Sequence, residues 1–220
     1  MRGLQLGRIN SLIRLIKIQW SIPLDYRGVQ LRRYTTAKND VDFFARHFRY
    51  STEQRPLTTV DLGCGSSPRN PFNADILQGV DIRESRENNI IAADLCCGRI
   101  PFPDNYCDFI SAFDFIEHIP RVTYVDGKSR FPFVELMSEI YRVLKVGGIF
   151  FSRTPAYPSK EAFQDPTHVN IITEDTFPCY FCGDSPWASL YGFEGSYDLI
   201  AQEWIYCWLL TLMKKTAKRQ

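Results

Sequence analysis

The sequence predicts a single α/β domain, built on a doubly wound and mostly parallel β-sheet with helices on both faces. Short, continuously apolar segments alternate with polar or helical connections, as they do in a parallel sheet covered on both sides. Two glycines, Gly63 and Gly65, form a turn directly after the first of these segments. Acidic residues stand at or near the ends of the first three segments. The length of 220 residues suits one domain of this kind.

Five apolar segments are predicted to form the parallel strands. They are separated by turn residues and are short enough to be strands rather than helices. The predicted strands cover residues 58–62, 78–82, 90–93, 108–113 and 149–153.

A helix is predicted between the last two of these strands, over residues 131–144. Its apolar positions recur at helical spacing and share one face. These positions are Val134, Met137, Ile140, Tyr141 and Leu144. The pair Gly147-Gly148 is expected to stop this helix.

Residues 1–50 are predicted to be a basic, amphipathic helical extension, and residues 51–220 the α/β domain. An apolar stripe on residues 9–20 lies beside Arg14 and Lys17, and Pro23 ends that helix. A second helix is expected over residues 38–48, where Val41, Phe44 and Phe48 recur at helical spacing. We favour packing of the first stripe on the domain; docking on a membrane surface is the alternative.

Charge is distributed unevenly along the chain. The net charge of +1 gives no overall argument for nucleic acid as a partner. Residues 1–40 nevertheless hold eight Lys or Arg against two Asp. Such an arm is either a solubilising face or a surface for an anionic or lipid-linked partner.

The seven cysteines form no regular framework. The one CxxC pair, Cys179 and Cys182, lacks a second pair for a zinc site. Reduced thiols are therefore expected, and with them a cytoplasmic protein without a signal peptide or membrane span. The aromatic tail is expected to close the fold with strands or a terminal helix, near residues 194–198 and 204–213.

The ends of the first three strands carry the residues expected to bind a cofactor. In an open α/β sheet, ligands bind at the carboxyl ends of the strands, at the switch point of the strand order. Asp61 places a negative charge beside the glycine turn, which disfavours a pyrophosphate and attracts a cationic ligand. Asp81 can accept hydrogen bonds from both ribose hydroxyls, and Asp94 from an adenine amino group.

With these residues the chain resembles the class I methyltransferases that depend on S-adenosylmethionine, and particularly the small type 11 group. The matching stretches are VDLGCGSSP, GVDI, AADL, PFPDNYCDFISAFDFIEHI and ELMSEIYRVLKVGGIFF, over roughly residues 58–154. The resemblance implies a Rossmann-like fold and S-adenosylmethionine as the cofactor.

The same resemblance implies a role for each cofactor-binding residue. Asp61, Gly63 and Gly65 would surround the methionyl part, Asp81 would bind the ribose, and Ile82 would be a further cofactor contact. The remaining contacts would be Asp94 and Leu95 at the adenine and Phe113 near the methionyl group.

The chain departs from the family pattern after the glycine turn. Ser67 stands where the family has its third glycine, and Pro68 and Pro71 follow. The helix usual at this point is therefore expected to be short or replaced by a loop. Pro68 at the third position of the G-x-G-x-x-G pattern also argues against a nicotinamide oxidoreductase, as does Asp61.

Two of the three histidines are candidates for a general base. His168 follows the fifth strand, where this fold inserts substrate-facing loops, and Asp165 could orient its imidazole. His118, in the pair Glu117-His118 after the fourth strand, is the second candidate, although packing the next connection is its alternative role. His47 is interpreted as structural, and no His/Asp spacing predicts a metal site.

The function expected from these residues is O-methylation of a small molecule or a glycan, related to surface polysaccharides. A histidine base suits a hydroxyl acceptor. Asp114, Arg153 and Tyr157 are expected near the acceptor pocket. A non-catalytic, methyltransferase-like binding protein remains the alternative. A nicotinamide oxidoreductase is a second and less favoured alternative.

Overall fold

A seven-stranded β-sheet forms the centre of the chain in the computed structural model, which describes residues 37–49 and 56–217. The strand order is β3-β2-β1-β4-β7-β9-β8, and β9 alone among these seven runs against the others. The strands are β1 (Thr58–Leu62), β2 (Ile76–Asp81), β3 (Ile90–Ala92), β4 (Cys107–Phe113), β7 (Leu144–Pro155), β8 (Tyr197–Ile205) and β9 (Trp208–Lys215). The order reverses between β1 and β4, where an open α/β sheet binds its ligands.

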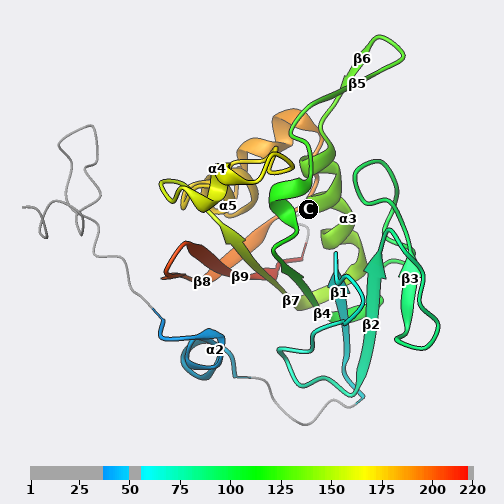
Figure 1. Cartoon of the computed structure of the whole chain (residues 1–220), viewed down its shortest axis with the longest axis vertical. Coiled ribbons are helices and arrows are strands. Elements are labelled where there is room, and N and C mark those ends of the chain that lie inside the picture. Colours follow the sequence, from blue (N-terminus) through cyan, green and yellow to red (C-terminus); the bar gives the residue numbers. More distant parts are fainter. Residues whose placement is uncertain (1–36, 50–55, 218–220) are drawn as a thin grey trace, which may run out of the picture. The chain divides into compact units, whose positions relative to one another are not determined.

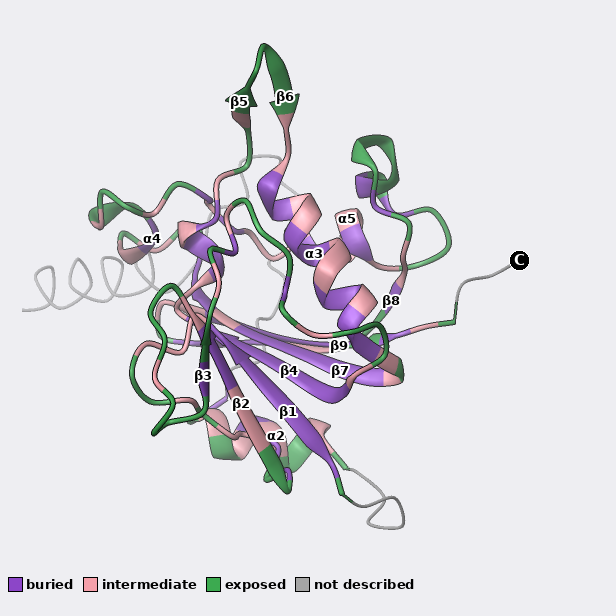
Figure 2. Ribbon diagram, turned by 90° about the vertical axis from the view of Figure 1, so that its right-hand side faces the viewer, coloured by how far each residue is buried: buried purple, intermediate pink, exposed green. Residues whose placement is uncertain are grey.

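Helices lie on both faces of this sheet (Figure 1). Figure 2 shows α3 and α5 on one side of it and α2 on the other. The helical segments are α2 (Asp40–His47), η1 (Ile116–His118), α3 (Pro132–Val143), α4 (Glu161–Gln164), α5 (Thr176–Phe181) and η2 (Trp187–Tyr191). A separate hairpin of β5 (Thr123–Val125) and β6 (Lys128–Arg130) projects between η1 and α3.

Neighbouring residues of β7 show how the two faces are packed. Side chains alternate across a strand. Phe151 therefore meets Phe43 and Phe44 of α2, at ring-centroid distances of 5.9 and 4.8 Å. Phe150 points to the other face, where its ring lies 6.4 Å from that of Phe177 in α5. The predicted doubly wound, mostly parallel sheet with helices on both faces is confirmed.

The burial of the central strands explains their apolar sequences. Every residue of β1 and β4 is buried, which accounts for the lack of an alternating apolar pattern, although Asp61 and Ser111 are among the buried residues. Asp108, an exception in β4, accepts hydrogen bonds from the amide of Thr58 and the ammonium of Lys145, at 2.9 and 2.8 Å.

A loop without a helix connects β1 to β2, as the sequence predicts. Proline lacks an amide hydrogen and restricts the residue before it, so Pro68 and Pro71 do not allow a regular helix here. Asn70 closes the loop, because its side chain exchanges hydrogen bonds of 2.9 Å with the backbone of Ala74 in both directions.

The predicted role of Gly147-Gly148 is wrong. The helix α3 ends at Val143, and β7 begins at the next residue. Gly147, with a φ of 81°, and Gly148 lie inside β7, where its pairing with β4 shifts register between Cys107 and Phe109. The glycines thus bend a strand rather than end a helix.

Other predicted bounds differ by a few residues. The second strand begins two residues earlier than predicted and ends at Asp81, which leaves Ile82 outside it. The tail forms the antiparallel pair β8 and β9, so closing strands are confirmed over a terminal helix. Of the extension predicted over residues 1–50, the amphipathic stretch at 9–20 lies outside the described residues, whereas α2 confirms the second helix. Within the described residues, none of the helices is long and apolar enough to cross a membrane.

Candidate functional site

The glycine turn after β1 approaches its neighbours closely on one side and is open on the other. Gly63 and Gly65 both have a φ of +62°, which favours glycine. The amide of Gly63 donates to the carbonyl oxygen of Val80 at 2.8 Å, and a Cβ atom there would meet the ring of Phe115 at 2.1 Å. A Cβ atom at Gly65 would meet nothing within 4 Å. The open side at Gly65 leaves room for a ligand to approach the backbone.

Asp81 is tied to this turn. Its Oδ2 accepts a hydrogen bond of 2.9 Å from the amide of Gly65, and its Oδ1 one of 3.3 Å from the amide of Arg83. Lone pairs remain on both oxygens for the hydroxyls of a ribose. Ile82, the next residue, is 67% exposed and offers an apolar surface at the same strand end.

Asp61 is buried beneath the turn rather than exposed in it. Its Oδ1 accepts from the hydroxyl of Ser111 at 2.6 Å, and its Oδ2 from the amide of Arg69 at 2.8 Å. Burial raises the pKa of this carboxyl to about 6, although both hydrogen bonds oppose the rise. The negative charge predicted beside the turn is therefore present above that pH and is held in place by β4 and by the loop.

Asp94 and Leu95 follow the end of β3. The Oδ1 of Asp94 accepts from the amide of Cys96 at 2.9 Å, and its Oδ2 contacts the Sγ of Cys97 at 3.2 Å. Asp94 itself is exposed, whereas Leu95 is buried under the turn that Asp94 closes. The carboxylate of Asp94 thus lies at the predicted end of the strand, and lone pairs remain on its oxygens to accept further hydrogen bonds.

A pocket of about 480 Å³ adjoins the end of β4. Phe113, Arg69 and Arg153 form much of its lining, together with Asp40, Asn70 and Pro71. The guanidinium groups of Arg69 and Arg153 lie 4.6 and 5.2 Å from the centre of the Phe113 ring. Phe113 and Arg153 were predicted at the site, whereas nothing in a single sequence marked Arg69 or Asp40.

Arg153 is held in this pocket by two carboxylates. It donates to Asp40 at 3.1 Å and to Asp114 at 2.5 Å. Asp114 has a φ of +50° and also accepts from the indole nitrogen of Trp208 at 2.6 Å. Asp114, which was predicted near the acceptor pocket, thus adjoins this pocket through its ion pair with Arg153.

The two candidate histidines meet at the carboxyl ends of β4 and β7. The rings of His118 and His168 lie 4.9 Å apart, edge to face. Glu117 lies beside them, and its Oε2 accepts from the hydroxyl of Thr154 at 2.8 Å. The amides of Val169 and Asn170 both donate to the carbonyl oxygen of Glu117 at 2.9 Å, which fixes the loop of His168 on η1.

The hydrogen bonds of both histidines decide which ring nitrogen carries the proton. The Nδ1 of His168 lies 3.1 Å from the carbonyl oxygen of Glu161, which can only accept. The Nδ1 of His118 lies 3.0 Å from the Oγ1 of Thr167, whose own hydrogen goes to Asp165 at 2.7 Å. In both neutral rings Nδ1 is therefore the donor, and Nε2 keeps a free lone pair.

Asp165 acts mainly on His118 rather than on His168. Its Oδ1 accepts from both the amide and the hydroxyl of Thr167, and Thr167 in turn accepts from His118. Its Oδ2 comes within 4.0 Å of the Nε2 of His168, which is too long for a hydrogen bond. The predicted orientation of His168 by Asp165 is not what the hydrogen bonds show; the carbonyl of Glu161 orients that ring.

Glu117 belongs to the same cluster. From the sequence it was identified only as the neighbour of His118, and no role was predicted for it. It is 1% exposed, and its Oε1 has no hydrogen-bond partner among the described residues. Burial raises the pKa of this carboxyl to about 7. His47, by contrast, contacts the buried Glu203 at 2.5 Å, in keeping with its structural interpretation.

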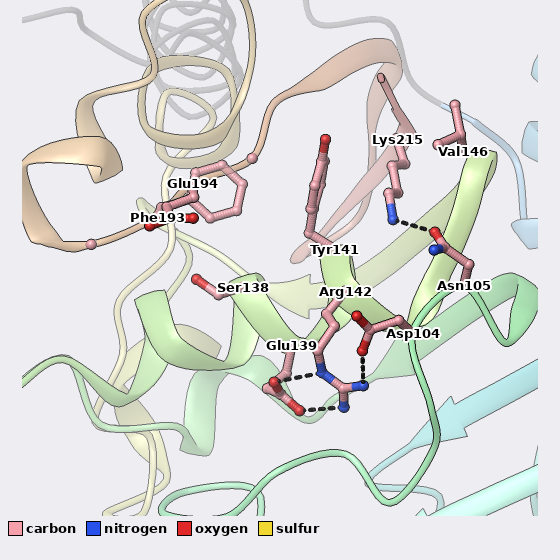
Figure 3. Close-up of a pocket in the computed structure, with 12 residues that line it drawn as sticks. Asp104, Asn105, Ser138, Glu139, Tyr141, Arg142, Val146, Phe193, Glu194 and Lys215 are labelled. Carbon is pink, nitrogen blue, oxygen red and sulfur yellow. Dashed lines mark hydrogen bonds and ion pairs between the residues drawn. The ribbon is translucent and has the colours of Figure 1, made fainter. Parts of the chain in front are cut away.

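A pocket of about 510 Å³ lies near the opposite ends of the strands, between α3 and the segment that precedes β8 (Figure 3). Figure 3 shows Arg142 facing Glu139 and Asp104, and Lys215 facing Asn105. Arg142 pairs with Glu139 and Asp104, and Lys215 donates to Asn105 at 2.9 Å. We interpret this pocket as a structural network, since none of the predicted site residues lines it.

Comparison with known proteins agrees with the fold. Residues 60–152, a little under half of the chain, match a family model described as a methyltransferase domain. The matched segment includes the glycine turn, Asp61, Asp81 and Asp94. Comparison with curated protein sequences finds no match.

Solved structures are similar in fold at low sequence identity. The cyclase SpnF is 14% identical with a TM-score of 0.53, over 84% of this chain and 88% of its own. A chain of the complex between the Trm112 methyltransferase activator of Haloferax volcanii and a methyltransferase is 14% identical with a TM-score of 0.50, over 81% and 94%. Since one of the two is called a cyclase, fold alone does not define the reaction here.

Proposed function

We propose that this chain is a class I methyltransferase that uses S-adenosylmethionine and that it transfers the methyl group to a hydroxyl oxygen of a small molecule or glycan. The observation that carries the proposal is the pair of hydrogen bonds at Nδ1 of His118 and His168, which leave the Nε2 of each neutral ring as an acceptor at the carboxyl ends of β4 and β7. A hydroxyl acceptor needs its proton removed, whereas an amine acceptor can attack through an existing lone pair.

The cofactor would lie across the ends of β1, β2 and β3. Asp81 would bind the ribose, next to Ile82, and the backbone of Gly65 would approach the ligand on its open side. Asp94 and Leu95 would take the adenine end. The methionyl end would lie between Gly63 and Phe113, above the buried charge of Asp61.

The acceptor would bind beside the histidines, at the next strand ends along the sheet. Tyr157 and Phe163 are both 54% exposed there, with ring centroids 6.4 Å apart, and they follow β7 as His168 does. Exposed aromatic rings beside a few polar groups are typical of a small-molecule site. They favour a sugar or another compact hydroxyl compound over a long polymer.

The transfer is an in-line displacement. As the acceptor oxygen forms its bond to the methyl carbon, the bond from that carbon to sulfur breaks, and the sulfonium becomes the neutral thioether of S-adenosylhomocysteine. The hydroxyl proton passes to the Nε2 of His168, which its hydrogen bond to Glu161 leaves free. Positioning of the two reactants supplies much of the rate.

A panel of acceptors tests this proposal. Purified protein is incubated with methyl-labelled S-adenosylmethionine and with hexoses, deoxyhexoses and nucleotide sugars, each beside the matching amino sugar. We expect methyl ethers of the hydroxyl compounds, and a loss of most of the turnover in His168→Ala without loss of S-adenosylhomocysteine binding. Methylation of the amino sugars alone, at nitrogen, would contradict the proposal.

A further inference from the structure

Three side chains from two distant parts of the sequence converge at the carboxyl ends of β4 and β7. Glu117 and His118 come from η1, and His168 comes from the loop after α4. Each offers one ligand atom, and the three atoms all lie within 4.8 Å of one another. Ligands of one ion with bonds of about 2.0–2.2 Å lie up to about 4.4 Å apart, so small side-chain rotations bring the three onto a single cation.

The hydrogen bonds of both histidines leave one nitrogen of each ring free to bind a metal. Histidines that bind a metal usually donate their other ring N–H to a carbonyl or a carboxylate, which fixes the ring and its tautomer. His168 donates from Nδ1 to the carbonyl of Glu161, and His118 from Nδ1 to Thr167, which is linked to Asp165. Both Nε2 lone pairs are therefore available to a cation.

Glu117 supplies an independent observation. A buried polar atom is almost always hydrogen-bonded, and an orphan needs an explanation. The Oε1 of Glu117 is buried and has no partner among the described residues, while its Oε2 is already bound to Thr154 at 2.8 Å. One carboxylate oxygen is thus held in a water-poor position next to two imidazoles and lacks a positive partner.

We propose that Glu117, His118 and His168 bind a divalent transition-metal cation. Two imidazole nitrogens and one carboxylate oxygen suit Zn²⁺, Fe²⁺ or Co²⁺ better than Mg²⁺ or Ca²⁺, which prefer oxygen ligands. Three protein ligands also leave coordination positions open, as in catalytic metal sites. The sequence predicted no metal site, because the two histidines are 50 residues apart and only the loop contacts of Val169 and Asn170 with Glu117 bring them together.

The role of this cation rests on the proposed function. With an acceptor hydroxyl at an open position, the cation lowers the pKa of that hydroxyl, and the proton leaves to water rather than to His168. The oxygen then attacks the methyl carbon, and the bond from carbon to sulfur breaks. The cation then replaces the free Nε2 of His168 as the group that activates the hydroxyl, because a ring nitrogen bound to a cation cannot also accept the proton; methyl transfer to the hydroxyl oxygen is unchanged.

Metal titration of the full-length, untagged protein tests the site without any acceptor. Protein treated with EDTA and dialysed is titrated with Zn²⁺ by calorimetry and with Co²⁺ by visible absorption, with Mg²⁺ as the comparison. We expect one equivalent of Zn²⁺ or Co²⁺ to bind, with a cobalt spectrum of nitrogen and oxygen ligands. Affinity is expected to fall more than about 10-fold in His118→Ala and His168→Ala, since even loss of an outer partner costs roughly 10–100-fold.

Two further variants make the test specific. His47→Ala removes the third histidine of the chain and is expected to bind the cation as the parent does. Thr167→Val removes the hydroxyl that contacts the His118 Nδ1 and leaves the backbone carbonyl oxygen of Thr167 as its acceptor at 3.3 Å. The variant is expected to weaken binding by at most roughly 10–100-fold while leaving all three ligands in place. Equal binding in the parent and both ligand variants, or a cobalt spectrum with thiolate charge-transfer bands, would overturn the site.

Measurements of methyl transfer distinguish the metal site from the proposed function. Binding of one cation that both ligand variants lose supports the site even where no hydroxyl compound is methylated, a result that would sink only the proposed function. Methylation of a hydroxyl at a rate that EDTA leaves unchanged would overturn the catalytic role of the cation and leave the proposed function standing. S-adenosylhomocysteine binding, measured on the same samples, is expected to be independent of the metal.

Discussion

The Oδ2 of Asp81 accepts a hydrogen bond of 2.9 Å from the amide of Gly65, and so links the end of β2 to the glycine turn that follows β1. The carboxylate therefore has two tasks. It holds a turn whose glycines have a φ of +62°, and we propose that its remaining lone pairs bind a ligand at the same edge. Substitutions at Asp81 can separate the two.

Asp81→Ala is expected to weaken S-adenosylhomocysteine binding at least about 10-fold, because hydrogen bonds to a charged group contribute about 1.5–3 kcal/mol each. Asp81→Asn keeps an acceptor for Gly65 and loses the charge, so its affinity should fall between those of the parent and of Asp81→Ala. Isothermal titration calorimetry measures all three. Asp198→Ala, at an exposed position of β8, serves as the control and should bind as the parent does.

We predict that Gly63 contributes mainly to the stability of the fold and Gly65 mainly to ligand binding. Alanine at either position is expected to lower the free energy of unfolding by about 1–2 kcal/mol, because the backbone there is left-handed. Gly63→Ala additionally places its Cβ against the ring of Phe115, whereas Gly65→Ala meets no atom within 4 Å. Urea unfolding should therefore show the larger loss of stability for Gly63→Ala. S-adenosylhomocysteine binding should be lost in Gly65→Ala, although the protein stays folded; unchanged binding there would show that the ligand does not approach this backbone.

Cofactor affinity is predicted to depend on pH through Asp61. Its pKa of about 6 in the free protein is raised by burial, and a cationic ligand favours the ionised form. Below that pH, binding must first release the proton of Asp61, so affinity falls by up to tenfold per pH unit as the pH decreases, and it is constant above. The ligand's own α-carboxyl and α-amino groups titrate outside the range from about pH 4.5 to 6.5.

Calorimetry of S-adenosylhomocysteine binding between about pH 5 and pH 8 measures this dependence. Asp61→Asn removes the titrating group and keeps one acceptor oxygen for the amide of Arg69, while its NH2 group faces the hydroxyl of Ser111, which can accept as well as donate. Its affinity should be weaker above pH 6 and nearly independent of pH. A variant that kept the full pH dependence of the parent would assign the titration to another group.

Much of the fold could be predicted because its determinants are local. The central strands β1 and β4 are buried along their whole length, so neither shows the alternation of a half-exposed strand, and the glycine turn follows β1 directly. The two prolines after the turn replace a helix with a loop for a reason that lies in those residues alone. The acidic residues Asp61, Asp81 and Asp94 all lie at the predicted edge of the sheet.

The rest depends on partners that are distant in the sequence. Gly147 resembles a helix stop, but the register shift that needs it is set by β4, almost 40 residues earlier. Asp61 was expected beside the ligand, yet Ser111 in β4 draws its carboxylate under the turn. His118 and His168 could each be marked as a candidate, whereas their contact with Glu117 depends on how the loop at 169–170 meets η1. The periodicity of apolar residues in a sequence carries no information on which distant residues come into contact.

An aromatic cluster joins α2 to the sheet and is predicted to make this helix part of the same cooperative unit. Phe44 lies 4.8 Å from Phe151 of β7 and 5.4 Å from Phe72 in the loop after β1, between ring centroids. Phe151→Ala removes a fully buried ring and should lower the free energy of unfolding by about 3–5 kcal/mol. Phe44→Ala is expected to cost less, since Phe44 is only partly buried.

Hydrogen exchange distinguishes a docked α2 from one that is merely adjacent. In Phe44→Ala the amides of residues 43–47 should exchange faster than in the parent, while those of β1 and β4 keep their protection. Val41→Ala is the matched control, because Val41 is 78% exposed on the same helix and its loss should leave exchange unchanged. If the amides of α2 exchanged as fast in the parent as in Phe44→Ala, the cluster would not hold the helix. The pocket lined by Asp40 and Arg153 would then lose one of its walls, because Asp40 begins α2.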